Sequence, residues 1–303
     1  MRILVTNDDG IHSPGLHALA AAVVASGHEV VVAAPSSDWS GASACLGPLE
    51  DPRRVPVEQV TFPVPDGSTM TGFSVGAPPA LISMLADLGG FGERPEMVVA
   101  GINRGPNTGR STLFSATIGA VLAGEGFGWS GMAVSLDVAV PDGSSPNRSD
   151  DGGPGREGLR EPHWGTAAGL ALMVLPWLVA APQRTILNLN VPDAPPADVR
   201  GLRSAGLAPV GGVRTIITGI DDHGLDLDLI ANDRPAPEGT DSAELAAGWM
   251  TVTSLLPTST AGVALPLEEW SAAWPDLIVE TGSIVGPLPP SRGRPAGLDS
   301  ITL

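Results

Sequence analysis

The chain has 303 residues, which is long enough for one large α/β domain or two smaller ones. Its net charge of −17 argues against nucleic acid or an anionic membrane as a partner. All 16 basic residues are arginine, which excludes a Schiff-base lysine and the lysine of a P-loop. The single Cys45 can form no disulfide within the chain, and the longest apolar run, at 167–181, is short for a membrane span. We therefore expect a cytoplasmic protein that is not bound to a membrane.

The first 35 residues predict a βαβ unit. An apolar strand at 2–6 is followed by a helix with Ser13 as its N-cap, Pro14 at its first position and Gly27 at its end. Residues 29–35 then predict a second buried strand. Uninterrupted apolar strands joined by a helix are typical of a parallel sheet with a right-handed crossover.

The alternation is interrupted at residues 46–75, whose Pro, Thr and Val content predicts extended segments or a hairpin. Residues 141–163 have the composition of a mobile loop, which acts either as a lid over a site or as an insertion without function. The expected helices lie at 78–89, 111–128 and 164–179, and the expected strands at 96–103, 131–136 and 184–192.

From about residue 200 the periodicity changes. Residues 213–233 alternate apolar and polar side chains around Asp222-His223-Gly224, which predicts a β-hairpin or arm. We assign no fold to the proline-rich residues beyond 265. The expected regions are a Rossmann-like, doubly wound α/β domain with a mostly parallel sheet at 1–200, a hairpin arm and oligomerisation segment at 201–265, and a tail at 266–303.

Polar, glycine-rich segments follow several predicted strands. Asp8 and Asp9 follow the first strand, Ser40 follows the second, and Asn103 ends the strand at 96–103. Ligands of a doubly wound sheet bind at the carboxyl ends of its strands, so we expect these side chains to lie together. Carboxylate, amide and hydroxyl oxygens suit a hard divalent ion such as Mg²⁺ or Mn²⁺, whereas no His or Cys cluster supports zinc.

Each of these motifs also has a plainer interpretation. Asp8-Asp9-Gly10 is more often a surface turn than a metal site, and Asn-x-Gly-Pro-Asn at 103–107 is mostly turn chemistry. His12 is either a substrate contact or a solvent-exposed loop residue, and His163, at the end of the 141–163 loop, is assigned no role. Only the shared position at predicted strand ends favours a metal site.

Four segments, in order between residues 3 and 136, resemble the SurE family of survival-protein-E phosphatases. They are ILVTNDDGIHSPGLHAL, VVAAPSSDWSGAS, PEMVVAGINRGPNTG and FSATIGAVLAGEGFGWSGMAVSL, and the likeness continues at ILNLNVP, GTD and WMTVTSL. The resemblance implies a Rossmann-like domain with a protruding hairpin and a C-terminal arm exchanged in a homodimer or homotetramer. It also implies a divalent-metal-dependent phosphomonoesterase of the 5′-nucleotidase type, acting on a small-molecule phosphate ester.

The resemblance also implies roles for individual residues. Asp8 and Asp9 are implied to be catalytic, because one of them orients the attacking water. The implied metal ligands are Asp8, Asp9, Ser40 and Asn103. The implied substrate- and phosphate-binding residues are Asn7, Gly41, Asn107, Ser115 and Thr117.

Five positions depart from the family pattern and mostly exchange polar groups for apolar ones. Two alternatives therefore stay open: a phosphatase specialised for another ester, and a catalytically degenerate SurE-like binding or assembly subunit. A Rossmann-type nucleotide-binding protein without hydrolysis is disfavoured because no Gly-x-Gly-x-x-Gly follows the first strand. The five positions are Ala77, Ala80, Phe114, Ala116 and Ala123.

Overall fold

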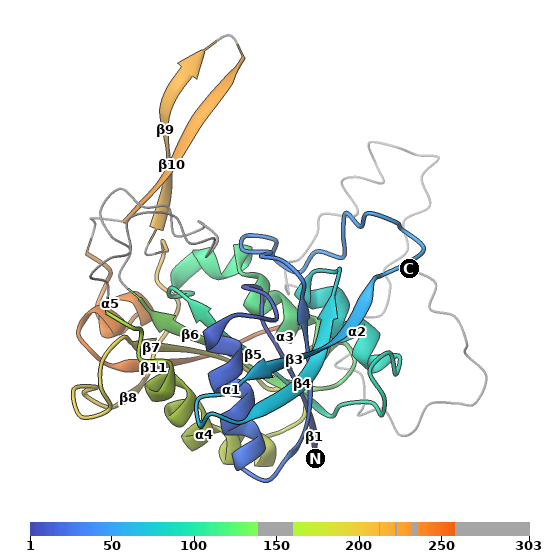
Figure 1. Ribbon diagram of the computed structural model, residues 1–303. Coiled ribbons are helices and arrows are strands. Elements are labelled where there is room, and N and C mark those ends of the chain that lie inside the picture. Colours follow the sequence, from blue (N-terminus) through green and yellow to red (C-terminus); the bar gives the residue numbers. More distant parts are fainter. Residues whose placement is uncertain (139–159, 212, 222, 232–234, 258–303) are drawn as a thin grey trace, which may run out of the picture. The chain divides into compact units, whose positions relative to one another are not determined.

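A nine-stranded mixed sheet forms the centre of the protein, as drawn in Figure 1. This computed structural model describes residues 1–138, 160–211, 213–221, 223–231 and 235–257. Most neighbouring strands are parallel, but the outer strand at 57–63 and the strand at 250–255 run antiparallel to their inner neighbours. In spatial order the strands are β3 (Val57–Pro63), β4 (Thr69–Val75), β2 (Glu29–Pro35), β1 (Arg2–Thr6), β5 (Met97–Arg104), β6 (Ser130–Asp137), β7 (Ile186–Pro192), β11 (Met250–Leu255) and β8 (Leu202–Ser204).

Helices cover both faces of this sheet, so its central strands are buried on both sides. Ile3, Leu4 and Val5 of β1 are all fully buried, as their unbroken apolar run predicts. Helices α1 (Pro14–Ala25) and α4 (Trp164–Ala180) pack on one face, and α2 (Pro79–Asp87) and α3 (Ala116–Gly126) pack on the other (Figure 1). The doubly wound α/β fold is therefore confirmed.

The predicted helix at 111–128 is wrong at its start. A 3₁₀ helix, η1 (Gly109–Phe114), comes first, and α3 begins only after Ser115. Ser115 has extended backbone angles and its hydroxyl accepts a hydrogen bond from Ile118 N at 3.2 Å, which makes it the N-cap of α3. Leu113 and Phe114 at the end of η1 extend the apolar pattern of α3, but the cap separates the two helices.

Residues 46–75 contain the hairpin that the sequence left as one option, since β3 and β4 pair antiparallel. Beyond residue 200, the structure contains β8, β11 and the helix α5 (Asp241–Ala246), none of which was predicted from the sequence. Both strands join the main sheet, and the predicted boundary at residue 200 stays a prediction. Most of the predicted loop at 141–163 and the whole tail at 266–303 lie outside the described residues.

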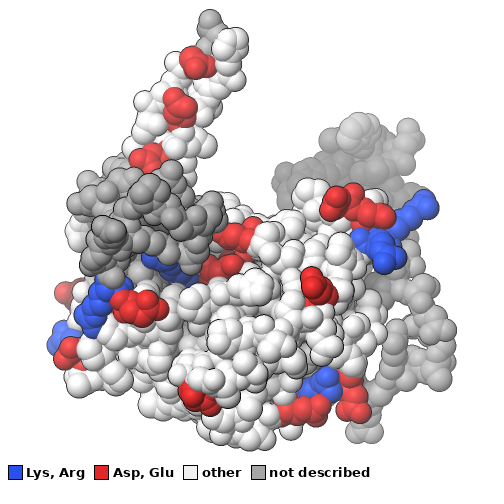
Figure 2. Space-filling model, viewed as in Figure 1, with Lys and Arg blue, Asp and Glu red and all other residues white. Residues whose placement is uncertain are grey.

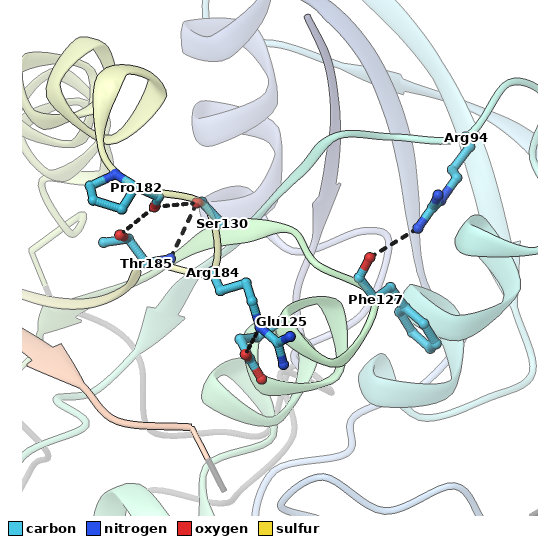
Figure 3. Close-up of polar contacts among 7 residues, drawn as sticks. All are labelled: Arg94, Glu125, Phe127, Ser130, Pro182, Arg184 and Thr185. Atoms are coloured by element: carbon cyan, nitrogen blue, oxygen red, sulfur yellow. Dashed lines mark hydrogen bonds and ion pairs between the residues drawn. The ribbon is translucent and has the colours of Figure 1, made fainter. Parts of the chain in front are cut away.

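Figure 3 shows polar contacts at the end of the sheet where β6 and β7 begin and α3 ends. Arg184 Nε donates to Glu125 Oε1 at 2.5 Å, and Arg94 Nη2 donates to the carbonyl of Phe127 at 3.0 Å. Ser130 Oγ accepts from Thr185 N at 3.2 Å, which joins the starts of β6 and β7. These bonds hold the C-terminal end of α3, whereas its N-terminal end carries Ser115 and Thr117 of the candidate site.

The predicted hairpin is present as β9 (Val213–Asp221) and β10 (Gly224–Ala231), which form a separate two-stranded antiparallel sheet. No helix within the described ranges has the length and apolar character to cross a membrane. On the face drawn in Figure 2, the described residues form no broad basic patch, in keeping with the acidic composition.

Candidate active site

The site lies where the strand order of the sheet reverses. β1 pairs with β2 on one side and with β5 on the other, and all three strands are parallel. The chain first moves outward from β1 to β2 and later returns to the opposite side of β1, so the loops after these strands diverge at this point. Such a reversal is where doubly wound proteins bind ligands.

The turn after β1 is built around Asn7. Its Nδ2 donates to Gly10 O at 3.1 Å and to Ser13 Oγ at 2.9 Å, and Ser13 in turn caps α1. Gly10 supports the turn because its φ of +99° is open to glycine but strained for other residues. Asn7 is fully buried and holds this turn, and its predicted contact with substrate stays a prediction.

The loop after β2 lies beside Asp8. Trp39 N donates to Asp8 O at 2.9 Å, which places Ser40, the next residue, close to the carboxylate turn. Ser40 is half-buried and Gly41 is exposed. The far end of the loop packs on α3 so closely that a Cβ at Gly119 would lie 2.3 Å from Ser43 O, which only glycine permits.

Thr117 joins Asp8 to Asn103. Its Oγ1 donates to Asp8 Oδ1 at 2.6 Å and lies 3.4 Å from Asn103 Oδ1. Asn103 Nδ2 donates to Gly105 O at 2.7 Å, which turns the amide oxygen of Asn103 toward Thr117. Two predicted ligand oxygens, from β1 and β5, therefore converge on one hydroxyl that has a single proton to give.

Burial raises the pKa of Asp8 to about 6, since only 3% of this residue is exposed. The hydrogen bond from the Thr117 hydroxyl lowers the pKa in part, and the negative charge of Asp38 raises it. Asp9 is only half-buried. The two adjacent carboxylates therefore lie in different surroundings, and Asp8 carries the desolvation cost.

The two hydroxyls at the start of α3 differ in what they can still do. Thr117 is fully buried and gives its proton to Asp8, so it orients the carboxylate. Ser115 Oγ accepts from Ile118 N and keeps its own proton for a further acceptor. Their predicted contacts with a phosphate stay predictions.

Asn107 lies on the loop after β5 with other polar residues that the sequence analysis did not select. Its Nδ2 donates to Ser135 Oγ at 2.9 Å, and its backbone contacts Asn188 and Asn190 of β7. The signal was present in ILNLNVP, where two asparagines interrupt an otherwise apolar buried strand. Asp241, which appeared only within the GTD segment, binds the amide of Gly109 at 2.8 Å.

The histidines are not among the residues whose oxygens converge on Thr117. His12 is exposed, and His163 lies 2.8 Å from Asp193, between its Nδ1 and the carboxylate Oδ1. A cavity of about 620 Å³, lined in part by His17, His163 and Trp164, includes none of the predicted site residues. Among the residues that the structure describes, no three His, Cys, Asp or Glu side chains cluster so as to hold a metal.

These features define a doubly wound α/β protein with an oxygen-rich site at its switch point. A family model described as survival protein SurE matches residues 3–210. The 5′/3′-nucleotidase SurE of Edwardsiella ictaluri is 34% identical over 287 residues, which cover 90% of this chain and 100% of that protein. The 5′-nucleotidase SurE of Aeromonas hydrophila is 33% identical over 283 residues, or 91% and 99% of the two chains.

The fold has a solved counterpart in the SurE protein from Aquifex aeolicus. The TM-score is 0.63 at 24% identity, over 86% of this chain and 95% of that one. The chain belongs to the SurE family. It is accordingly a hydrolase of phosphoric monoesters.

Proposed function

We propose that this protein is a divalent-metal-dependent phosphomonoesterase that hydrolyses nucleoside 5′-monophosphates to nucleoside and phosphate. The substrate class rests on the relatives, which are named 5′- or 5′/3′-nucleotidases. The metal rests on one observation, the convergence of Asp8 and Asn103 oxygens on the Thr117 hydroxyl.

The chemistry of these donors fits a hard cation. Thr117 can satisfy only one of two converging oxygens, and Asp8 is a carboxylate whose burial raises its pKa to about 6. An ion held by oxygen ligands would supply the missing positive charge. The proposed ligands are Asp8, Asp9, Ser40 and Asn103, and their oxygen-only chemistry favours Mg²⁺ or Mn²⁺.

A bound divalent ion would polarise the phosphoryl oxygens and lower the pKa of a coordinated water. The chain itself supplies orientation. Thr117 fixes the rotation of the Asp8 carboxylate, and Asp8 or Asp9 directs the attacking water toward phosphorus. Ser115 and Asn107 each keep a proton that can be donated to a phosphoryl oxygen as negative charge develops there. The exposed Gly41, which follows the proposed ligand Ser40, is also proposed to bind the phosphate.

We also propose that the enzyme works in the cytoplasm as a homodimer or homotetramer. The single, partly buried Cys45 supports a reducing compartment, and the exposed apolar side chains of the β9–β10 hairpin support an assembly.

The test is an assay of p-nitrophenyl phosphate, AMP, GMP, CMP and several metabolite phosphates, with EDTA and with added Mn²⁺ or Mg²⁺. We expect hydrolysis to stop in EDTA, to return with metal, and to favour a nucleoside 5′-monophosphate. Full turnover in EDTA would contradict the metal. Preference for a different ester would replace nucleoside 5′-monophosphates as the proposed substrate class. The absence of any hydrolysis would favour a binding or assembly subunit.

A further inference from the structure

The loop that leaves β5 is held by side chains from the C-terminal half of the chain. This site loop, residues 103–109, carries Asn103 and Asn107. Asn103 and Arg104 still pair with β6, and Gly105 N donates to Leu136 O at 2.9 Å. Beyond Gly105 the strand pairing ends, so other groups must determine where Asn107 lies.

Asn190 of β7 pairs with the backbone of Asn107. Its Oδ1 accepts from Asn107 N at 2.7 Å, and its Nδ2 donates to Asn107 O at 3.1 Å. The Asn190 carboxamide thus supplies both backbone hydrogen bonds that a neighbouring strand would supply to Asn107. Asn188 Nδ2 donates to the same carbonyl at 2.8 Å, and both asparagines are fully buried.

The register of the sheet explains this reach across two strands. Asn103 of β5 lies opposite Ser135 of β6, and Ser135 lies opposite Asn190 of β7. A polar row therefore crosses the sheet from the proposed ligand Asn103 to Asn190. Ser135 Oγ, in the middle of this row, accepts from the side chain of Asn107 at 2.9 Å.

Asp241 of α5 holds the other end of the site loop. Its Oδ2 accepts from Gly109 N at 2.8 Å, and its Oδ1 accepts from Ala208 N at 2.9 Å. The approach is tight, because a Cβ on Gly109 would lie 2.2 Å from Val210 O. Asp241 is fully buried, so these backbone amides take the place of its hydration.

A buried polar group that loses its hydrogen-bond partner destabilises the folded state, so the loop conformation that satisfies all of these buried groups is favoured. We propose that Asn190 and Asp241 are positioning residues for the phosphoester hydrolysis proposed above. Together with Asn188 and Ser135 they form a loop clamp, which fixes Asn103 and Asn107 relative to Asp8. This inference rests on the proposed function.

The role differs from general support of the fold in what it predicts for kinetics. Displacement of the site loop moves a metal ligand and a phosphate contact together, so the reacting geometry suffers more than the encounter with substrate. Loss of a partner that orients a ligand typically costs about 10- to 100-fold in activity. A merely structural role would lower the stability and leave kcat per folded molecule unchanged.

The test uses near-isosteric variants of the full chain. Asn190→Asp exchanges the Nδ2 donor for an oxygen, and Asp241→Asn exchanges one acceptor oxygen for a donor group. Asn188→Ala removes a single bond of the clamp and serves if the other two variants do not fold. The matched control is Thr251→Val, because Thr251 lies opposite Asn190, is fully buried, and has a hydroxyl without a hydrogen-bond partner among the described residues.

Two measurements are made on each folded variant: kcat and KM with p-nitrophenyl phosphate and Mn²⁺, and amide hydrogen exchange of peptides that cover 103–109. We expect Asn190→Asp and Asp241→Asn to lower kcat about 10- to 100-fold with a smaller change in KM. Exchange in these peptides should accelerate while exchange in β1 does not. Asn188→Ala should show the same changes in smaller measure, and Thr251→Val should match the parent.

Unchanged exchange in residues 103–109 of all three clamp variants would overturn the inference, and so would faster exchange with the parent's kcat. If the parent hydrolyses no phosphate ester, the proposed function fails and the positioning role fails with it. The exchange result then still decides, separately, whether the clamp holds the site loop.

Discussion

At the scale of single residues, the opening motif is unusual because Asp8 and Asp9 are neighbours with different surroundings. Asp8 is buried and hydrogen-bonded to Thr117, whereas Asp9 is half-buried. Without an ion, the folded protein holds Asp8 at a cost that grows as the carboxyl ionises. The sequence placed both carboxylates at the end of a strand but did not show which of the two is desolvated.

A pH dependence of stability follows for the metal-free protein. The pKa of Asp8 is raised from 3.8 to about 6, so the folded state binds more protons than the unfolded state between these values. The free energy of unfolding therefore falls as pH rises through this window. Its slope with pH is proportional to the number of protons bound by the unfolded state minus the number bound by the folded state, and this difference is negative here. We expect the contribution of Asp8 to fall by on the order of 2 kcal/mol between pH 4 and pH 7.

The measurement is urea unfolding in EDTA at several pH values, for the parent and for Asp8→Asn. The variant cannot titrate at this position, so the difference between the two proteins isolates Asp8 from the other carboxyls, of which Asp137 also has a pKa raised by burial. The same difference at pH 4 and pH 7 would contradict the raised pKa.

Most of the residues that depart from the family pattern are shielded from solvent. Ala77, Ala80 and Ala116 are buried in the core and Ala123 is half-buried on α3, whereas Phe114 is 62% exposed. Phe114 also lies next to the cap Ser115, and its carbonyl accepts from Ser43 N at 3.1 Å. Of these five positions, Phe114 is the one whose side chain is free to meet a leaving group.

We therefore expect Phe114→Tyr to restore a polar contact to the leaving group. The ratio of kcat/KM for AMP to that for p-nitrophenyl phosphate should rise about 2- to 10-fold, the value of one hydrogen bond. Leu113→Ala, at the exposed neighbouring residue, should leave this ratio unchanged. An unchanged ratio in Phe114→Tyr would show that this ring does not face the leaving group.

At the scale of elements, sequence patterns identified the strands that are apolar and the helices that are long. Strands β1, β2, β5, β6 and β7 and helices α1, α2 and α4 lie where they were predicted, within a few residues. Three elements were missed. β8 has three residues and α5 has six, which is too few for a periodicity to develop, whereas β11 has six residues and is longer than the predicted β1. The start of α3 was misplaced because the apolar Leu113 and Phe114 of η1 directly precede it, although Ser115 offered a capping signal.

The β9–β10 hairpin contains a register shift that the alternation of apolar and polar residues does not predict. Ile217 lies opposite Leu227 and Ile220 lies opposite Leu225, with a register shift between Asp226 and Leu227. The shift places all four apolar side chains on one face despite their odd spacing on β9. They are 54%, 63%, 75% and 57% exposed, in the order in which they are named above.

An exposed apolar face of this kind predicts assembly through the arm. We expect a dimer or tetramer by light scattering at micromolar concentration, and Ile220→Asp should shift the population toward monomers because it buries a charge in the contact. Thr218→Asp is the matched control, since Thr218 is exposed on the same strand and has no register partner in β10. A monomeric parent, or equal dissociation of both variants, would contradict this assembly.

At the scale of the whole molecule, the half of the site that comes from β1, β2 and β5 was accessible to sequence reasoning. Its residues follow predicted parallel strands, and such strands end at one edge of the sheet. The other half was accessible only in part. The two asparagines in ILNLNVP stand out in a buried strand, but Asn190 and Asp241 reach the site through β7 and α5. Their contacts depend on the register of three strands and on an element that the sequence did not reveal.

Because the proposed metal site joins loops from three strands, occupation of the site should stabilise the entire fold. An ion that binds only the folded protein adds about 2.7 kcal/mol at a concentration 100 times its Kd. For a chain of this size each kcal/mol raises Tm by about 2 to 4 °C. We therefore expect Mn²⁺ to raise Tm by several degrees in calorimetry at pH 7.5, and EDTA to reverse the rise.

Asp9→Asn should abolish the rise because a ligand is lost. Asp38→Asn, which removes a nearby exposed carboxylate that is not a proposed ligand, should retain it. An equal Mn²⁺ response in the parent and in Asp9→Asn would mean that the ion binds elsewhere, and the metal role of the opening motif would be lost with it.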